Sequence, residues 1–352
     1  MTESDPIVAE TAARIFADLA DPQTVNRAGD TPWKEALWRA LADAGLTLAW
    51  TPEKLGGAGA SLTDGCAVLG VAGRYAVPVP IAETLLAGWL LSRAELAAPA
   101  GAMTVAPARP RDKVTLNADG SLSGKIGGIP FARDAEHIAV AATADHNTTI
   151  GLVRTVDCRV NEGQSLAGDG SDTVTFDRTK PIASAPANID ASALILMGAT
   201  VRSLQMAGAL EAVLALSVRY ANERVAFERP IGKFQAVQQN LARLAGETAA
   251  ALAAAGSAAD TIANRDAFDD AVFLEAASAK IRAGEAAAEG AAIAHQVHGA
   301  IGFTREHVLH RFTLRLLSWR DDFGSESHWA LALGSMVAAR GSDNFWPILA
   351  AR

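Results

Sequence analysis

The segment Arg224–Gln235 gathers cations around a break in a helical pattern, a combination suited to an anionic ligand. Pro230 and Gly232 make the break, and three positive charges surround it: Arg224, Arg229 and Lys233. Because arginine can grip phosphate oxygens through two parallel N–H donors, the segment predicts contact with a phosphate-bearing ligand. Two structural alternatives remain open. The segment could be a solvated connection between helices, or its arginines could pair with Glu223 or Glu228.

A second segment, Gln296–Thr304, has the backbone freedom that a turn in contact with a cofactor needs. Gly299 and Gly302 can adopt positive φ and allow a close approach of the main chain. No strand is expected before this segment and its spacing is not GxGxxG, so it does not predict a Rossmann nucleotide site. The glycine run at residues 56–59 fails the same test, and both segments could simply end helices.

Three carboxylates lie close together in the sequence and are the candidate catalytic residues: Asp321, Asp322 and Glu326. A general base could be held there, in a dry position that raises the pKa of a carboxyl group. The alternative is that these carboxylates are solvated or paired with arginine.

Four histidines form two pairs with i, i+3 spacing: His295 with His298, and His307 with His310. Each pair could share one face of a helix. Helical zinc pairs are usually spaced i, i+4 with an acid nearby, and no thiolate or carboxylate of matching spacing joins these histidines. The sequence therefore predicts no metal site.

The elements that position these residues change in character along the chain. Residues 7 to about 100 have helical periodicity, interrupted by a glycine-rich stretch at 51–60. Between about 101 and 187, short runs rich in Val, Ile and Thr are separated by turn pairs such as Gly127-Gly128. These runs predict a small β domain. Its strands are expected to be antiparallel, because no helix intervenes to make a parallel crossover.

From residue 189 onward the periodicity is helical again and the predicted helices lengthen. Apolar residues from Leu194 to Val218 recur mostly every three or four positions. Alanine dominates residues 248–260, which favours a closely packed bundle helix over a linker. The sequence therefore predicts a mainly α protein with a small β domain. Its three parts are expected at residues 1–100, 101–187 and 188–352.

Composition limits the class of protein. Of 352 residues, 50% are hydrophobic and 20% are charged, with a net charge of −8, so there is ample apolar material for a folded core. The acidic balance argues against nucleic-acid binding. Two cysteines, Cys66 and Cys158, cannot form a disulfide framework, which favours a reducing compartment. No run reaches the ~20 apolar residues of a membrane helix and no signal peptide is visible, so a soluble, cytoplasmic protein is expected.

In this order, the segments resemble the motifs of the flavin-dependent acyl-CoA dehydrogenases over nearly the whole chain. Residues 51–59 look like the family's PE-x-x-GG-x-G stretch, and residues 76–81 look like its PVP turn. Arg224–Gln235 is similar to R-x-x-F-x-x-P-I-x-x-F-Q. Gln296–Thr304 is similar to Q-I-H-G-G-I-G-F-T, and an Arg-Asp pair at 320–321 follows as in the family.

The resemblance implies a fold and a cofactor. The fold has an N-terminal helical domain, a middle antiparallel β-barrel and a C-terminal four-helix bundle. FAD would bind where the bundle meets the barrel and across a subunit interface, with an arginine on its pyrophosphate. The residues implied to bind it are Arg224, Phe227, Ile231, Gln235, Gln296, Gly299 and Ala300. The last three would contact the dinucleotide from the neighbouring subunit, and Ala300 stands where the family has its second glycine.

The resemblance also implies a reaction, the α,β-dehydrogenation of an acyl-CoA thioester. A glutamate removes the α-proton while the β-hydrogen leaves as hydride to the flavin, and electrons pass to an electron-transfer flavoprotein. Hydrogen bonds to the thioester carbonyl stabilise the developing enolate. Arg202 matches an arginine of the family and is expected near the substrate.

The chain departs from the family pattern in three places. No glutamate falls where the family's Y-E-G-T segment follows the Arg-Asp pair. The alternative position for the base, directly before Arg202, is Val201. The strand that enters the barrel, T-E-x-x-x-G-S-D in the family, is reduced to Met103–Arg109.

Three hypotheses follow from these departures. In the first, the chain is an active homodimeric or homotetrameric dehydrogenase whose base is one of the three candidate carboxylates. In the second, it is a catalytically silent subunit that contributes half of a shared FAD site to a paralogous partner. In the third, it is a scaffold that keeps only the fold.

Overall fold

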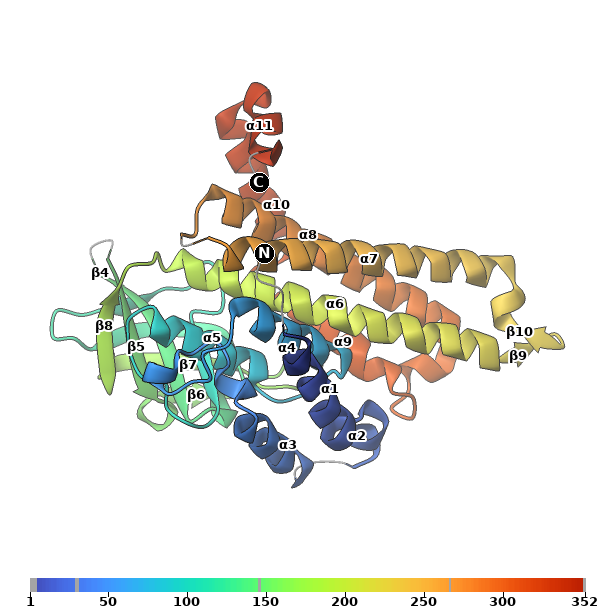
Figure 1. Cartoon of the computed structure of the whole chain (residues 1–352), viewed down its shortest axis with the longest axis horizontal. Coiled ribbons are helices and arrows are strands. Elements are labelled where there is room, and N and C mark those ends of the chain that lie inside the picture. The colour runs from blue at the N-terminus through green and yellow to red at the C-terminus, as the bar shows by residue number, and fades with distance from the viewer. Residues whose placement is uncertain (1–4, 29–31, 145–146, 266, 351–352) are drawn as a thin grey trace.

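The computed structural model describes residues 5–28, 32–144, 147–265 and 267–350. A β domain lies at one end of a long helical bundle, and the N-terminal helices pack along the side of that bundle (Figure 1). The acidic start of the chain, residues 1–4, lies outside the described residues.

The N-terminal part is helical, as predicted. Its α-helices are α1 (Pro6–Ala20), α2 (Pro22–Ala28), α3 (Pro32–Asp43), α4 (Leu62–Arg74) and α5 (Ile81–Ser92). The helix α4 begins with a capping box, in which Ser61 and Asp64 each accept a hydrogen bond from the other's backbone N–H. The loop expected at 51–60 is present and holds only one 3₁₀ turn, Glu53–Leu55.

The middle part is the predicted β domain, with one sheet of eight strands. The strands are β1 (Met103–Ala106), β2 (Val114–Leu116), β3 (Leu122–Pro130), β4 (His137–Ala144), β5 (Asn147–Arg154), β6 (Arg159–Asn161), β7 (Ser171–Thr179) and β8 (Ala183–Ala187). Their order is β6-β7-β3-β2-β4-β5-β8, and β1 pairs with β4 beside β2.

The expectation of wholly antiparallel strands is wrong at two pairs. β1 and β2 both run parallel to β4, with Met103 opposite His137 and Val114 opposite Ala142. The reason is that β3 makes the return: it runs antiparallel to β2, so the chain re-enters β4 in the direction of β2. The strand β3 therefore provides the connection between the parallel strands β2 and β4 that a crossover helix provides in other proteins.

The turn expected at Gly127-Gly128 is also wrong, because both glycines lie inside β3. The pairing of β3 with β7 shifts register between Ile126 and Ile129, which marks a bulge. Gly128 has a φ of +68°, and a Cβ there would lie 2.7 Å from the guanidinium of Arg109. The two glycines therefore allow β3 to bend at the bulge and leave room for the side chain of Arg109.

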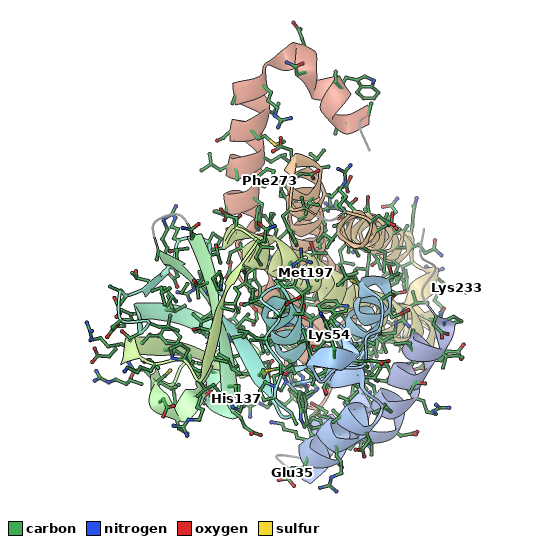
Figure 2. The ribbon with its side chains drawn as sticks, turned by 60° about the vertical axis from the view of Figure 1, so that its left-hand side comes forward. Glu35, Lys54, His137, Met197, Lys233 and Phe273 are labelled. Atoms are coloured by element: carbon green, nitrogen blue, oxygen red, sulfur yellow. The ribbon has the colours of Figure 1, made fainter. Side chains whose placement is uncertain are left out.

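The C-terminal part contains the predicted four-helix bundle. Its helices are α6 (Ser192–Glu223), α7 (Gln235–Ala263), α8 (Asp270–His298) and α9 (Leu309–Trp319). Two further helices follow, α10 (Glu326–Arg340) and α11 (Phe345–Ala350). The first turns of α10 pack against the body with Trp329 buried, and the rest of α10 projects outward together with α11 (Figures 1 and 2). The helix α6 is long and apolar enough to cross a membrane, but 94% of its most apolar window is buried inside the fold, as in the core helix of a soluble protein.

The largest apolar core joins all three parts of the chain. It includes Phe16 of α1, Val105 of β1 and Leu194 of α6, each of them fully buried. Because this core crosses both expected boundaries, the division at residues 100 and 187 stays a prediction.

The helices α4 and α6 approach so closely that glycine is required at the contact. A Cβ on Gly208 would lie 2.0 Å from the carbonyl oxygen of Gly70, and one on Gly73 would lie 2.1 Å from that of Gln205. We expect Gly208→Ala to lower the free energy of unfolding by about 1–3 kcal/mol, because two helix backbones must move apart. Gly246→Ala, with nothing within 4 Å of the new Cβ, should slightly raise the free energy of unfolding, because alanine favours a helix more than glycine does. Urea unfolding of both variants tests this, and equal effects would contradict it.

Candidate functional site

The connection between α6 and α7 is a tight hairpin at the end of the bundle far from the β domain (Figure 1). Its strands are β9 (Val225–Ala226) and β10 (Arg229–Pro230). The two residues at its tip, Phe227 and Glu228, both have positive φ, of 52° and 64°. Residues other than glycine rarely adopt this backbone conformation, and backbone strain of this kind is concentrated at functional segments.

The hairpin presents a free cation and an exposed aromatic ring. Arg224 is exposed, and its guanidinium makes no ion pair or hydrogen bond with any residue that the structure describes. Pairing with Glu223 or Glu228, the structural alternative for this segment, is therefore not observed. Phe227 is 89% exposed. Arg229 instead lies over the ring of Phe234, 4.3 Å from its centroid.

The glycine-containing segment at the end of α8 arrives at the same place. After His298 the chain turns at Gly299, with a φ of +65°, into a 3₁₀ helix, Gly299–Phe303. A cavity of about 470 Å³, here called the bundle-end cavity, joins the two segments. Its lining residues are Tyr220, Glu223, Arg224, His298, Ala300 and Ile301.

A second cavity of about 570 Å³ shares Ala300 with the first, and Gln296 and Gly299 are also among its lining residues. The structure thus brings four of the seven expected cofactor residues to two adjoining cavities. The other three, Phe227, Ile231 and Gln235, lie on the hairpin and at the start of α7, outside both cavity walls.

Four lining residues of the bundle-end cavity were not among the expected cofactor residues: Tyr220, Glu223, His298 and Ile301. Tyr220 carries no motif signal, although its carbonyl accepts the Arg224 N–H at 2.8 Å. His298 lies inside a recognised segment, but its spacing suggested only a metal ligand. In the described residues no group of three His, Cys, Asp or Glu side chains could hold a metal ion.

The second polar centre is a buried ion cluster where α5, α6 and the loop after α9 meet. The Arg202 guanidinium donates to Glu83 at 2.5 Å, to Asp322 at 2.9 Å and to Gln205 at 2.6 Å. Arg202 and Glu83 are 2% and 1% exposed. Burial raises the pKa of Glu83 above its ordinary value, and the Arg202 charge opposes that shift. We call these four residues the junction cluster.

The loop that follows α9 is fixed from several sides. Phe323 is fully buried with a φ of 55°, against Gly198 of α6, where a Cβ would lie 2.3 Å from its ring. The buried Lys280 donates to the carbonyl oxygens of Arg320 and Gly324, at 2.5 and 2.8 Å. Burial lowers the pKa of Lys280 to about 8. The loop therefore has little room to rearrange.

The three candidate catalytic carboxylates do not converge on one dry site. Glu326 begins α10 and pairs with Arg320 at 2.5 Å. Asp322 pairs with Arg202. Asp321 is exposed and, with Asp322, lines a cavity of only about 160 Å³. A carboxylate that removes an α-proton needs a dry position without a cation on it, and none of these three has one.

A larger cavity of about 670 Å³ lies between the β domain and the bundle. Apolar side chains dominate its wall, among them Ile195 and Leu196 of α6 and Trp329 of α10. Phe273 completes this wall beside the foot of α10 (Figure 2). Such a volume and lining are typical of small-molecule sites.

Two family models match the chain. The model described as acyl-CoA dehydrogenase, N-terminal domain, matches residues 2–94, and the acyl-CoA dehydrogenase, C-terminal domain, matches residues 191–325. The acyl-CoA dehydrogenase IpdE2 of Mycobacterium tuberculosis is 34% identical over 326 residues, which cover 89% of this chain and 91% of that protein.

Solved structures share the fold along its whole length. The ChsE4–ChsE5 complex from Mycobacterium tuberculosis aligns with a TM-score of 0.85 and 24% identity, over 96% of this chain and 98% of that one. The Tcur3481–Tcur3483 steroid ACAD aligns with a TM-score of 0.82 and 26% identity, over 95% of this chain and 97% of that one.

Proposed function

The chain belongs to the acyl-CoA dehydrogenase family, and on that premise we propose that it is one subunit of a heteromeric, FAD-dependent dehydrogenase of acyl-CoA thioesters. In this assembly the chain supplies the part of the site that binds the dinucleotide phosphates. A paralogous partner supplies the flavin half of the site and the catalytic glutamate. Electrons leave to an electron-transfer flavoprotein, and the assembly acts in the cytoplasm.

One contrast between the two ends of the bundle carries this proposal. At the far end, Arg224 is exposed and unpaired among the described residues, beside two cavities and an exposed aromatic ring. At the junction, Arg202 and Asp322 satisfy each other and Phe323 fills the space against α6. The bundle end therefore offers an unpaired cation to an anionic ligand. In the junction cluster both carboxylates, Glu83 and Asp322, are paired with Arg202, so neither is free to act as a base.

The residues at the bundle end fit a dinucleotide. The Arg224 guanidinium can bind pyrophosphate oxygens, Phe227 can cover an apolar edge, and Gln296 offers an amide beside an open backbone turn. When bound, FAD supplies the acceptor for the hydride that leaves the β-carbon of the substrate. The role of this chain is to bind and orient the cofactor and to exclude water from its phosphates.

The cavities next to the junction cluster fit a flavin poorly. They measure about 160 and 20 Å³, below the range of about 300–1,000 Å³ typical of ligand sites. Arg202, expected near the substrate, lines only the smaller one.

Two structural relatives support a partner of the same family. Each of these relatives pairs two differently named proteins, ChsE4 with ChsE5 and Tcur3481 with Tcur3483, and the second pair is a steroid ACAD. A bulky ring-bearing acyl group is therefore the substrate class that we propose for the heteromer.

The cavity of about 670 Å³ between the β domain and the bundle favours a second candidate, an active homomer. Its apolar wall could take an acyl chain, with one of the three candidate carboxylates released from its present contacts to act as base. This candidate requires one FAD in every chain.

Flavin stoichiometry separates these functions. The chain is purified alone and together with each paralogue encoded near it, and flavin absorbance and anaerobic bleaching by a panel of acyl-CoAs are recorded. We expect the chain alone to show no bleaching, and one co-purified pair to carry one FAD per two chains and to bleach. One FAD per chain in a bleaching homomer would establish the second candidate. A colourless pair would indicate a scaffold.

A further inference from the structure

One side of the C-terminal helix α10 is exposed along its length and carries no charge. Its side chains recur every three or four positions, as on a single face of an α-helix. We call this surface the arm face, and its residues are Ser327, Ala330, Leu331, Gly334, Ser335 and Ala338. Leu331 is 71% exposed, and residues 327–339 include no Asp, Glu, Lys or Arg. The solvent side of a surface helix is ordinarily charged or polar, so this face suits contact with protein.

The opposite side of α10 is held by α8 near both ends of the helix. Trp329, close to the start of α10, is 3% exposed, and its ring centroid lies 6.0 Å from that of Phe273 in α8. Arg340, the last residue of α10, pairs with Asp270 at the start of α8. Because both contacts are made to one helix, α10 has a fixed direction and presents the arm face before any partner arrives.

The helix α11 extends the arm and is also uncovered. It follows the 3₁₀ turn Ser342–Asn344 and turns away from the axis of α10 (Figure 2). Its six residues are too few for a helix that is stable in water without packing, and its Trp346 is 73% exposed. The arm projects from the side of the bundle, whereas the hairpin that carries Arg224 lies at the end of the bundle (Figure 1). The arm is therefore available for a contact separate from the cofactor site.

We propose that the arm face packs against the arm face of a second copy of this chain, with the two α10 helices antiparallel about a two-fold axis. Such a pair requires a surface that complements itself. The arm face does so when the axis passes between Gly334 and Ser335. Leu331 of each copy then lies opposite Ala338 of the other, so each large side chain meets a small one. The small residues at the centre let the helices approach closely, and opposite ends of the two helix dipoles face each other.

The chemistry of the arm face favours a second copy over a charged partner. The face has no side chain that could pair with an acidic or basic surface, and its complement in size lies on the same helix. In the two-fold pair, α11 of each copy lies beside the start of the other α10, which covers Trp346. The contact goes beyond the proposed function and does not depend on it. Within the heteromer, it would join two pairs that each share a cofactor site.

Light scattering by the full-length chain, purified alone and measured over a series of protein concentrations, tests the contact. We expect the wild-type chain to be a dimer. Leu331→Glu places a charge on the arm face and should raise the dissociation constant of the dimer at least about 30-fold, the effect of one interface hot spot. Leu166→Glu is the matched control. Leu166 is 65% exposed but lies in the β domain, so its replacement should leave the dissociation constant unchanged.

Disulfide cross-linking tests the antiparallel orientation. The background is Cys158→Ser, which removes the half-buried native thiol and leaves only the buried Cys66. Under mild oxidation, the double variant Leu331→Cys/Ala338→Cys should form a covalent dimer. Leu331→Cys alone should not, because in the antiparallel pair the two copies of residue 331 are separated by seven residues, or about 10 Å, along the helix axis.

Three results would overturn the inference. The first is a wild-type chain that stays monomeric at every concentration and a double variant that does not cross-link. The second is a covalent dimer of Leu331→Cys alone, which would indicate parallel helices. The third is a Leu331→Glu variant that no longer co-purifies with a paralogue but self-associates as the wild type does, which would show that the arm covers the paralogue. None of these results bears on flavin stoichiometry, so the proposed function is tested separately.

Discussion

Arg202→Ala is expected to lower the free energy of unfolding by about 3–5 kcal/mol, the cost of removing one partner of a buried ion pair. The substitution leaves Glu83 1% exposed and without its cation, and it removes the partners of Gln205 and Asp322. Arg243→Ala is the control, because its pair with Glu289 at 3.2 Å is largely exposed and should be worth less than about 1 kcal/mol. Urea unfolding of both variants measures the difference, and similar losses would contradict the prediction.

The loss in Arg202→Ala should also depend on pH. Burial already raises the pKa of Glu83 in the folded wild-type protein, and removing the positive charge raises it further. A carboxyl whose pKa is higher in the folded state contributes stability at low pH and loses it as the pH rises through the folded pKa. The variant should therefore be less destabilised at pH 5 than at pH 8. Replacing both Glu83 and Arg202 by apolar residues should remove this pH dependence.

Arg224→Met is expected to weaken FAD binding by the co-purified heteromer about 10- to 100-fold, without lowering the melting temperature of the flavin-free protein. Charge-assisted hydrogen bonds to phosphate are worth about 1.5–3 kcal/mol, and this guanidinium has no other partner among the described residues that would lose stability. The readout is the flavin retained after dialysis at a series of protein concentrations.

Arg229→Met is the matched control for this loss, since it removes the same charge from the same hairpin. The Arg229 guanidinium already lies over Phe234, so its replacement should change FAD retention much less. If Arg229→Met released FAD as readily as Arg224→Met, general charge attraction would explain binding and the specific role of Arg224 would be lost.

Local patterns were sufficient to predict the order of the parts and the bundle-end segments. Helical periodicity and the break at Pro230 are contained in short stretches of sequence, and the structure has helices on both sides of a hairpin there. The prediction of the strand directions was wrong because it, too, used only local patterns. Whether β1 runs parallel to β4 is decided by a ladder between residues more than thirty positions apart, which no local pattern records.

The junction cluster could not be predicted because its members come from three distant segments. Glu83 and Asp322 lie 119 and 120 positions from Arg202, and only the packing of α5, α6 and the loop after α9 joins them. One signal was available. Glu83 is the single charge in the apolar run 81–91, and such a charge needs a partner once the helix is buried.

The distance between the hairpin end of the bundle and the β domain has a consequence for cofactor retention (Figure 1). In the proposed function, the phosphates bind at the hairpin end of this chain and the partner supplies the flavin half of the site. Each complete site is then built from two chains, so every dissociation of the pair opens a site. Cofactor content then follows mass action: dilution releases flavin, and flavin in excess favours the assembled pair. Subunit pairing and cofactor loading become a single equilibrium.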